Sequence, residues 1–146
     1  MDELEFKKTC AEVNELPCVF AKAVLRGCAA CSHSEKVLIA EREAIACQSP
    51  GGHQRCGGLI ARLRENALFA LRLKQLDGPL PHGKEMKVEC GGLLGLSSVA
   101  QGEDAEHVDD IGALVSESLE RWHDFEQLPY SEISQWVVKY QSRRKR

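Results

Sequence analysis

The stretch CAACSHSEKVLIAEREAIACQSPGGHQRC, residues 28–56, contains four cysteines and two histidines in a chain of 146 residues. Ser32 followed by Glu35 has the spacing of a helix-capping box, and no glycine or proline interrupts residues 32–46. Apolar residues recur there with a helical period, at Val37, Leu38, Ala40, Ala44 and Ile45. This part of the sequence therefore predicts a helix that runs from about Ser32 to Cys47.

The segments on either side favour further helices. Residues 2–13 are amphipathic and should end ahead of Pro17, which itself suits the first turn of a helix that Gly27 terminates. After the turn SPGG, residues 53–76 are apolar almost all round, which predicts a buried central helix. Because short connections normally join antiparallel helices, we expect these four to form an antiparallel arrangement.

The second half of the chain begins with the loop DGPLPHG, residues 77–83. The Gly-rich residues 84–100 fit a short strand or an extended link, and their conformation stays open. Asp109 or Asp110 is expected to start a helix that extends to about Phe125, and Ser131 to start the last one. We therefore predict an all-α fold with four N-terminal helices, a Gly-rich connection and two C-terminal helices.

Length and composition indicate one globular domain, with 43% apolar and 28% charged residues. Within residues 1–146, we expect a Cys-rich helical bundle over 1–76, a loop or linker region over 77–108, and the C-terminal helices with a basic tail over 109–146. A net charge of -3 gives no general attraction for nucleic acid. Without a secretory signal or a run of apolar residues that spans a bilayer, we expect a cytoplasmic protein with no membrane span.

Seven cysteines in such a chain need an explanation. The odd number rules out complete pairing within one chain, and a reducing compartment rarely sustains a framework of disulfides. Metal ligation, thiol redox chemistry and inert burial remain. For CAAC, residues 28–31, redox chemistry is the weaker reading, because a thioredoxin-like motif requires a βαβ setting that the flanking sequence lacks.

Two cysteine quartets are candidate metal ligands. Spacing alone favours Cys28, Cys31, Cys47 and Cys56. A helix between Cys31 and Cys47, however, would hold its ends about 20 Å apart, too far for ligands of one metal. In an antiparallel arrangement one end collects a different set, Cys10, Cys18, Cys47 and Cys56. Cys28 and Cys31 then lie at the opposite end, which Cys90 can approach. We favour the second quartet and keep the first as its rival.

The expected cofactor is an Fe–S cluster of the 4Fe–4S type, with zinc or no metal as alternatives. Helix starts at Cys18 and Cys56 would stabilise thiolates over thiols. The five histidines are scattered over predicted loops and polar faces, and no catalytic triad or phosphate-binding loop stands out, so nothing indicates an enzyme. The chain reads as an electron-transfer or assembly accessory that works with a protein partner. The alternative is an all-α interaction module whose cysteines fill the core.

Overall fold

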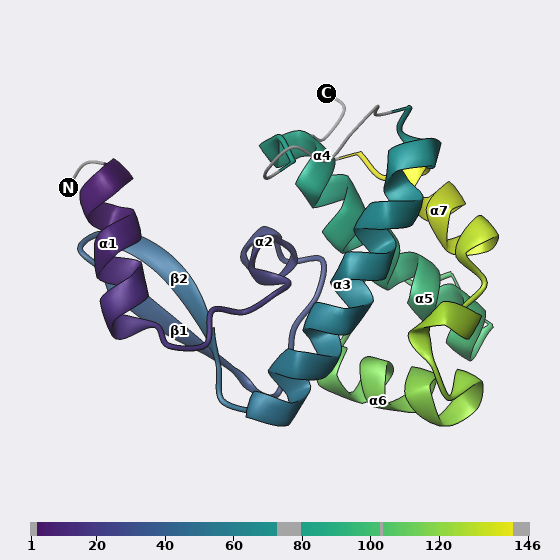
Figure 1. Ribbon diagram of the computed structural model, residues 1–146, viewed down its shortest axis with the longest axis horizontal. Helices are drawn as coiled ribbons and strands as arrows, with labels where there is room; N and C mark the ends of the chain where they lie inside the picture. Colours follow the sequence, from purple (N-terminus) through teal and green to yellow (C-terminus); the bar gives the residue numbers. More distant parts are fainter. Residues whose placement is uncertain (1–2, 73–79, 103, 142–146) are drawn as a thin grey trace.

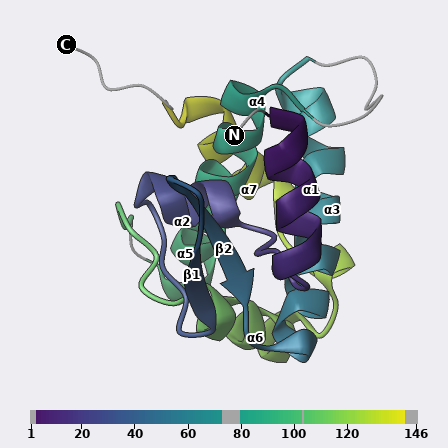
Figure 2. The ribbon, with the colours of Figure 1, turned by 90° about the vertical axis from the view of Figure 1, so that its left-hand side faces the viewer.

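A computed structural model describes residues 3–72, 80–102 and 104–141 (Figure 1). Along the chain the elements are α1 (Glu3–Val13), α2 (Ala21–Arg26), β1 (Ser34–Ile39), β2 (Arg42–Cys47), α3 (Pro50–Ala70), α4 (His82–Met86), the π-helix η1 (Lys87–Gly91), α5 (Gly92–Gln101), α6 (Ile111–Trp122), the 3-10 helix η2 (Phe125–Gln127) and α7 (Tyr130–Lys139). Helix α1 and the two strands lie to one side of a body built from α3 to α7, with α2 between them. Figure 2 shows the molecule from the side of α1 and the hairpin.

The helical body is built around α3, the helix predicted to be the buried centre. Its apolar stripe packs into a core shared with α5, α6 and α7, whose fully buried side chains include Leu59, Leu63, Leu93, Leu96, Ile111, Ile133 and Val137. The predicted start of α6 is confirmed, because Asp110 is its N-cap and accepts the N–H of Gly112 at 3.1 Å. Among the described residues, no helix is long and apolar enough to cross a membrane.

The predicted helix over residues 32–47 is wrong, and with it the all-α class and the four N-terminal helices. Those residues form an antiparallel hairpin, in which β1 and β2 pair from Ser34 opposite Cys47 to Ile39 opposite Arg42. Ala40, in the two-residue turn, has a φ of 58°, in the left-handed region. The hairpin buries Ile39 and leaves its neighbour Leu38 71% exposed. Such alternation between successive residues is typical of a strand, whose side chains point in turn to opposite faces of the sheet.

Pairing with a distant segment explains why the hairpin prevails over helix propensity. The N–H of Cys18 donates to the carbonyl of Ile45 at 2.9 Å, and the N–H of Cys47 donates to that of Leu16 at 2.7 Å. The side chain of Asn14 adds a further bond to the Ile45 carbonyl. Residues 14–18 thus form an extended edge along β2, a long-range contact that outweighs local preference.

The Gly-rich connection is helical rather than extended, and it is buried. Residues 82–101 form α4, η1 and α5 in succession, and most of the side chains from Met86 to Ser97 are inaccessible to solvent. Two of its glycines, Gly91 and Gly95, lie where α7 approaches closely, and Gly92 faces Leu63 of α3: a Cβ on Gly95 would lie 3.0 Å from the Trp136 side chain. The glycines therefore serve close helix packing and do not mark a linker.

A disulfide joins the segment after α2 to η1. Cys28 and Cys90 have an S–S distance of 2.26 Å and lie 62 positions apart in the sequence. Both side chains are buried. The argument from a reducing compartment does not predict this bond, although Cys90 was expected to approach the end that holds Cys28.

Candidate functional site: a four-cysteine pocket

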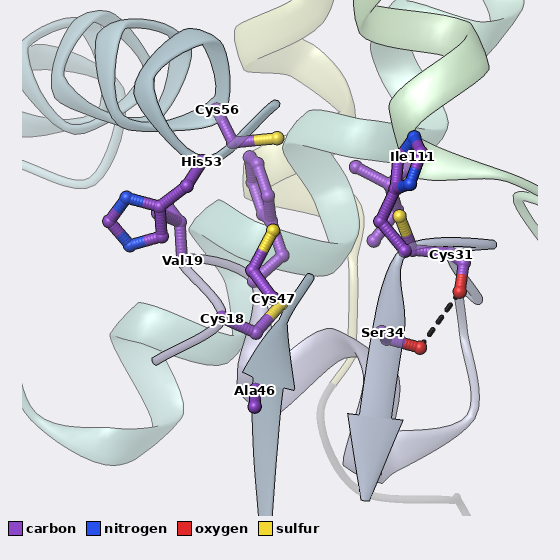
Figure 3. Close-up of a pocket in the computed structure, with 11 residues that line it drawn as sticks. Cys18, Val19, Cys31, Ser34, Ala46, Cys47, His53, Cys56 and Ile111 are labelled. Atoms are coloured by element: carbon purple, nitrogen blue, oxygen red, sulfur yellow. Dashed lines mark hydrogen bonds between the residues drawn. The ribbon is translucent and has the colours of Figure 1, made fainter. Parts of the chain in front are cut away.

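Four free cysteines line one pocket between the hairpin and the helical body (Figure 3). The space is small, with a cavity volume of about 20 Å³, which is roughly enough for one water molecule. Its lining consists of Cys18, Val19, Phe20, Cys31, His33, Ser34, Ala46, Cys47, His53, Cys56 and Ile111. In Figure 3 the sulfurs of Cys18, Cys47 and Cys56 lie along one side and that of Cys31 lies across from them. The pocket is therefore walled by thiols and apolar side chains.

Three of the cysteines are positioned by the backbone around β2. The two hydrogen bonds between residues 16–18 and β2 place Cys18 opposite Ile45, so that Cys18 is a diagonal neighbour of Cys47, the last residue of that strand. A two-residue connection then leads into α3, whose N-cap Ser49 accepts the N–H of Gly52 at 3.0 Å. Cys56 lies in the second turn of α3, so that its side chain returns to the same space.

Cys31 reaches the pocket from a segment held against the start of α6. The N–H of Ala30 donates to the carbonyl of Val108 at 2.9 Å, and the N–H of Ile111 donates to that of Ala30 at 2.8 Å. A Cβ on Gly112 would lie 3.6 Å from the sulfur of Cys31. The N-terminus of the 12-residue helix α6 is thus directly beside this thiol.

Two of the pocket thiols, Cys18 and Cys56, are protonated at neutral pH. Burial, with smaller contributions from the charges of neighbouring cysteines, raises the pKa of Cys56 to about 12 and that of Cys18 to about 11. Cys47 donates a hydrogen bond from its thiol to the carbonyl of Ser49 at 3.3 Å. Because thiolates are the nucleophilic form, Cys18 and Cys56 are poorly suited to thiol redox catalysis.

Asp110 borders the pocket next to Cys31. Burial acts to raise the pKa of this carboxyl, but hydrogen bonds from Ser32, Ala113 and the Cys31 thiol outweigh burial and hold the pKa below its ordinary value. The N–H of Ser32 lies 3.1 Å from its Oδ1. An ionised Asp110 thereby fixes both the start of α6 and the loop that carries Cys31.

Of the two histidines at the pocket, His53 does not add a ready ligand. Nε2 of His53 lies 3.0 Å from the carbonyl oxygen of Pro17, to which it donates when it carries the proton. Figure 3 shows the His53 ring turned away from the sulfurs. Over the residues that the structure describes, no group of three or more His, Cys, Asp or Glu side chains is arranged to hold a metal ion. A site for a single ion is thus not preformed there.

The pocket takes members from both predicted quartets. Cys18, Cys47 and Cys56 of the favoured quartet line it, whereas Cys10 belongs to α1 and its side chain lies outside the described part of the structure. From the rival quartet Cys31 joins them, whereas Cys28 is bonded to Cys90.

Because of the hairpin, Cys31 and Cys47 line the same pocket. Ser34 pairs directly with Cys47, so the chain returns to its starting level, whereas a helix would have held the two cysteines about 20 Å apart. A turn signal in the sequence would have predicted the hairpin, and the hairpin places Cys31 with the other pocket cysteines. Ala40 and Glu41 supply none, since such turns normally contain Gly or Asn.

Fold and pocket together define a mainly helical protein with an N-terminal hairpin, one buried disulfide and a separate four-cysteine pocket. No protein-family model matches the chain, and no curated protein or solved structure shows significant similarity to it.

Proposed function

We propose that the pocket binds a 4Fe–4S cluster through Cys18, Cys31, Cys47 and Cys56, and that the protein is a non-enzymatic accessory in electron transfer or cluster assembly. The observation that carries this proposal is the convergence of four thiols, from four separate segments, around an open apolar pocket. A cytoplasmic location and a protein partner belong to the same proposal.

Zinc and a 4Fe–4S cluster differ in the spacing of sulfurs that they require. Around a single zinc ion, with Zn–S bonds of about 2.3 Å, the four sulfurs would have to lie within about 4 Å of one another. In a 4Fe–4S cluster each thiolate binds its own iron atom, so the ligand sulfurs lie farther apart around a larger core. Over the described residues no group of three or more ligating side chains is arranged to hold a metal ion, so binding of either ligand would require the cysteines to rearrange.

The surroundings suit an anionic cluster in part. The dipole of α6 favours negative charge at Cys31, whereas its first N–H groups already bond to Ala30 and Asp110, and the ionised Asp110 opposes that charge. The positive charge of Arg55 acts to lower the pKa of Cys56, opposing the larger effect of burial. Binding of iron would displace the thiol protons, and Cys31 would give up its hydrogen bond to Asp110.

The competing function is an interaction module with inert cysteines. The raised pKa values of Cys18 and Cys56 favour it, because buried structural cysteines behave in this way. The interaction module leaves unexplained why four thiols from separate segments line the same pocket.

Replacing any one of the four pocket cysteines by Ser is expected to abolish cluster binding, because each thiolate would hold one iron. The wild-type protein would be reconstituted anaerobically with iron and sulfide and analysed for both elements and for the visible absorption of the cluster. Equal amounts of iron and labile sulfide are expected, together with a gain in stability, since ligand binding stabilises the folded state.

Cys10→Ser is the matched control, and it should bind the cluster as the wild type does. Loss of binding in Cys10→Ser with retention in Cys31→Ser would replace our ligand set by the other quartet. A wild-type protein that takes up neither iron nor zinc, and is equally stable with and without them, would remove the proposal in favour of the interaction module.

A further inference from the structure

Two buried carboxyl groups lie behind the cysteine pocket, one helical turn apart. Glu85 of α4 is 5% exposed and Glu89 of η1 is 3% exposed. Carboxylates are rarely buried unless a cation compensates their charge. The charges around this pair therefore decide its protonation state.

One guanidinium lies close to the two carboxyl groups, and it is hydrogen-bonded to Glu85. Arg64 of α3 donates from Nε and Nη2 to the two carboxylate oxygens of Glu85, at 3.0 and 3.1 Å. Glu89 receives the N–H of Ala23 at 3.1 Å. Two buried carboxyl groups one helical turn apart thus share one close positive charge, which favours a proton on one of them.

The other charged groups near Glu89 do not supply the missing cation. Nζ of Lys22, on α2, lies 3.1 Å from Nδ1 of His82, and its charge lowers the pKa of Glu89 only as a minor effect. Lys87, on η1 itself, donates to the carbonyls of Val138 and Tyr140. The Cys18 thiol is the remaining titratable group whose interaction with Glu89 is resolved. Burial, together with the hydrogen bond and charge of Glu85, raises the pKa of Glu89 to about 8.

Glu89 also lies at a joint between α2 and η1. Its Oε1 holds the N–H of Ala23, in the first turn of α2, and the next residue, Cys90, is bonded to Cys28 just beyond the end of α2. Helix α2 is thus attached to η1 near both its ends. The segment that enters α2 carries Cys18 and Phe20, two residues of the pocket lining.

We propose that Glu85 and Glu89 hold one proton between them and that this proton makes the attachment of α2, and with it the wall of the cysteine pocket, sensitive to pH. When the proton is lost, two negative charges lie in a buried site with one guanidinium. The folded state is then destabilised. This inference does not depend on what the pocket binds.

The test compares wild-type protein with Glu89→Gln, both metal-free and with the disulfide intact. Gln keeps the acceptor for the Ala23 N–H and a donor for Glu85 but cannot ionise. The pKa of Glu89 lies near 8 in the folded state and near its ordinary 4.5 in the unfolded state, so the folded protein binds the proton more tightly between these values. The stability of the wild type relative to Glu89→Gln should therefore fall as the pH rises towards 8 and level off above it.

Urea unfolding from pH 6 to pH 9 measures this difference. We expect the folding equilibrium constant of the wild type, relative to Glu89→Gln, to fall by up to about tenfold per pH unit below pH 8. The exposed Glu120→Gln is the control and should follow the wild type. Parallel pH profiles for wild type and Glu89→Gln would overturn the proposal.

Infrared spectroscopy of the wild type keeps the proposal testable even if Glu89→Gln does not fold. A protonated carboxylic acid has a carbonyl stretch distinct from that of a carboxylate. We expect this band at neutral pH and its loss at alkaline pH while the protein is still folded. A wild-type spectrum without the band at neutral pH would contradict the proposal, whether or not the pocket binds a cluster.

Discussion

Loss of the Cys28–Cys90 disulfide is expected to lower the free energy of unfolding by about 4 kcal/mol. The bond closes a segment whose ends lie 62 positions apart, and such a cross-link removes a large part of the conformational freedom of the unfolded chain. Urea unfolding of the oxidised wild type and of Cys28→Ala/Cys90→Ala would measure the change. Ala is chosen because a Ser hydroxyl would be buried at both positions.

Reduction of the wild-type protein separates the effect of the bond from that of packing. The reduced protein keeps both sulfur atoms in the core, so it should lose the stability due to the cross-link and retain the apolar contacts. A reductant should leave the double variant unchanged. Equal unfolding midpoints for oxidised and reduced wild type would show that the bond contributes nothing to stability.

The helices that can be predicted from the sequence are those whose own residues carry a clear helical signal. Residues 53–70 carry an apolar stripe long enough to predict the central part of α3, and Asp110 marks the start of α6 through its own side chain. The Gly-rich segment that becomes η1 and α5 lacks such a signal. Its glycines are required by the proximity of α7 and α3, which a single sequence does not reveal.

The hairpin could not be predicted because its stability is not local. Glu, Lys, Arg and Ala dominate residues 34–47 and favour a helix, whereas the strands are held by pairing with each other and with residues 14–18. The wrong prediction of a helix over residues 32–47 also limited which cysteines could be assigned to the pocket. The proximity of Cys47 and Cys56 follows from a short connection in either fold, but Cys31 reaches them only through the hairpin.

The glycines of the helical body allow a second large effect to be predicted, at Gly91. This residue has helical backbone angles, with φ −62° and ψ −41°, so that helix propensity alone predicts a gain in stability from Ala. An added Cβ, however, would lie 2.6 Å from Cα of Val137 and 2.8 Å from the carbonyl oxygen of Trp136. Both are backbone atoms of α7, which cannot move aside as a side chain can.

Gly91→Ala is therefore expected to destabilise the protein by about 3 kcal/mol, at the upper end of the range for overpacked cores. Gly57→Ala is the matched control, because Gly57 lies within α3 and no described atom approaches its added Cβ within 4 Å. That substitution should stabilise the protein by about 0.5–1 kcal/mol through helix propensity. Urea unfolding of both variants measures the two changes in the free energy of unfolding, which are expected to have opposite signs. If Gly91→Ala were as stable as the wild type, α7 could not pack against η1 as closely as the structure places it.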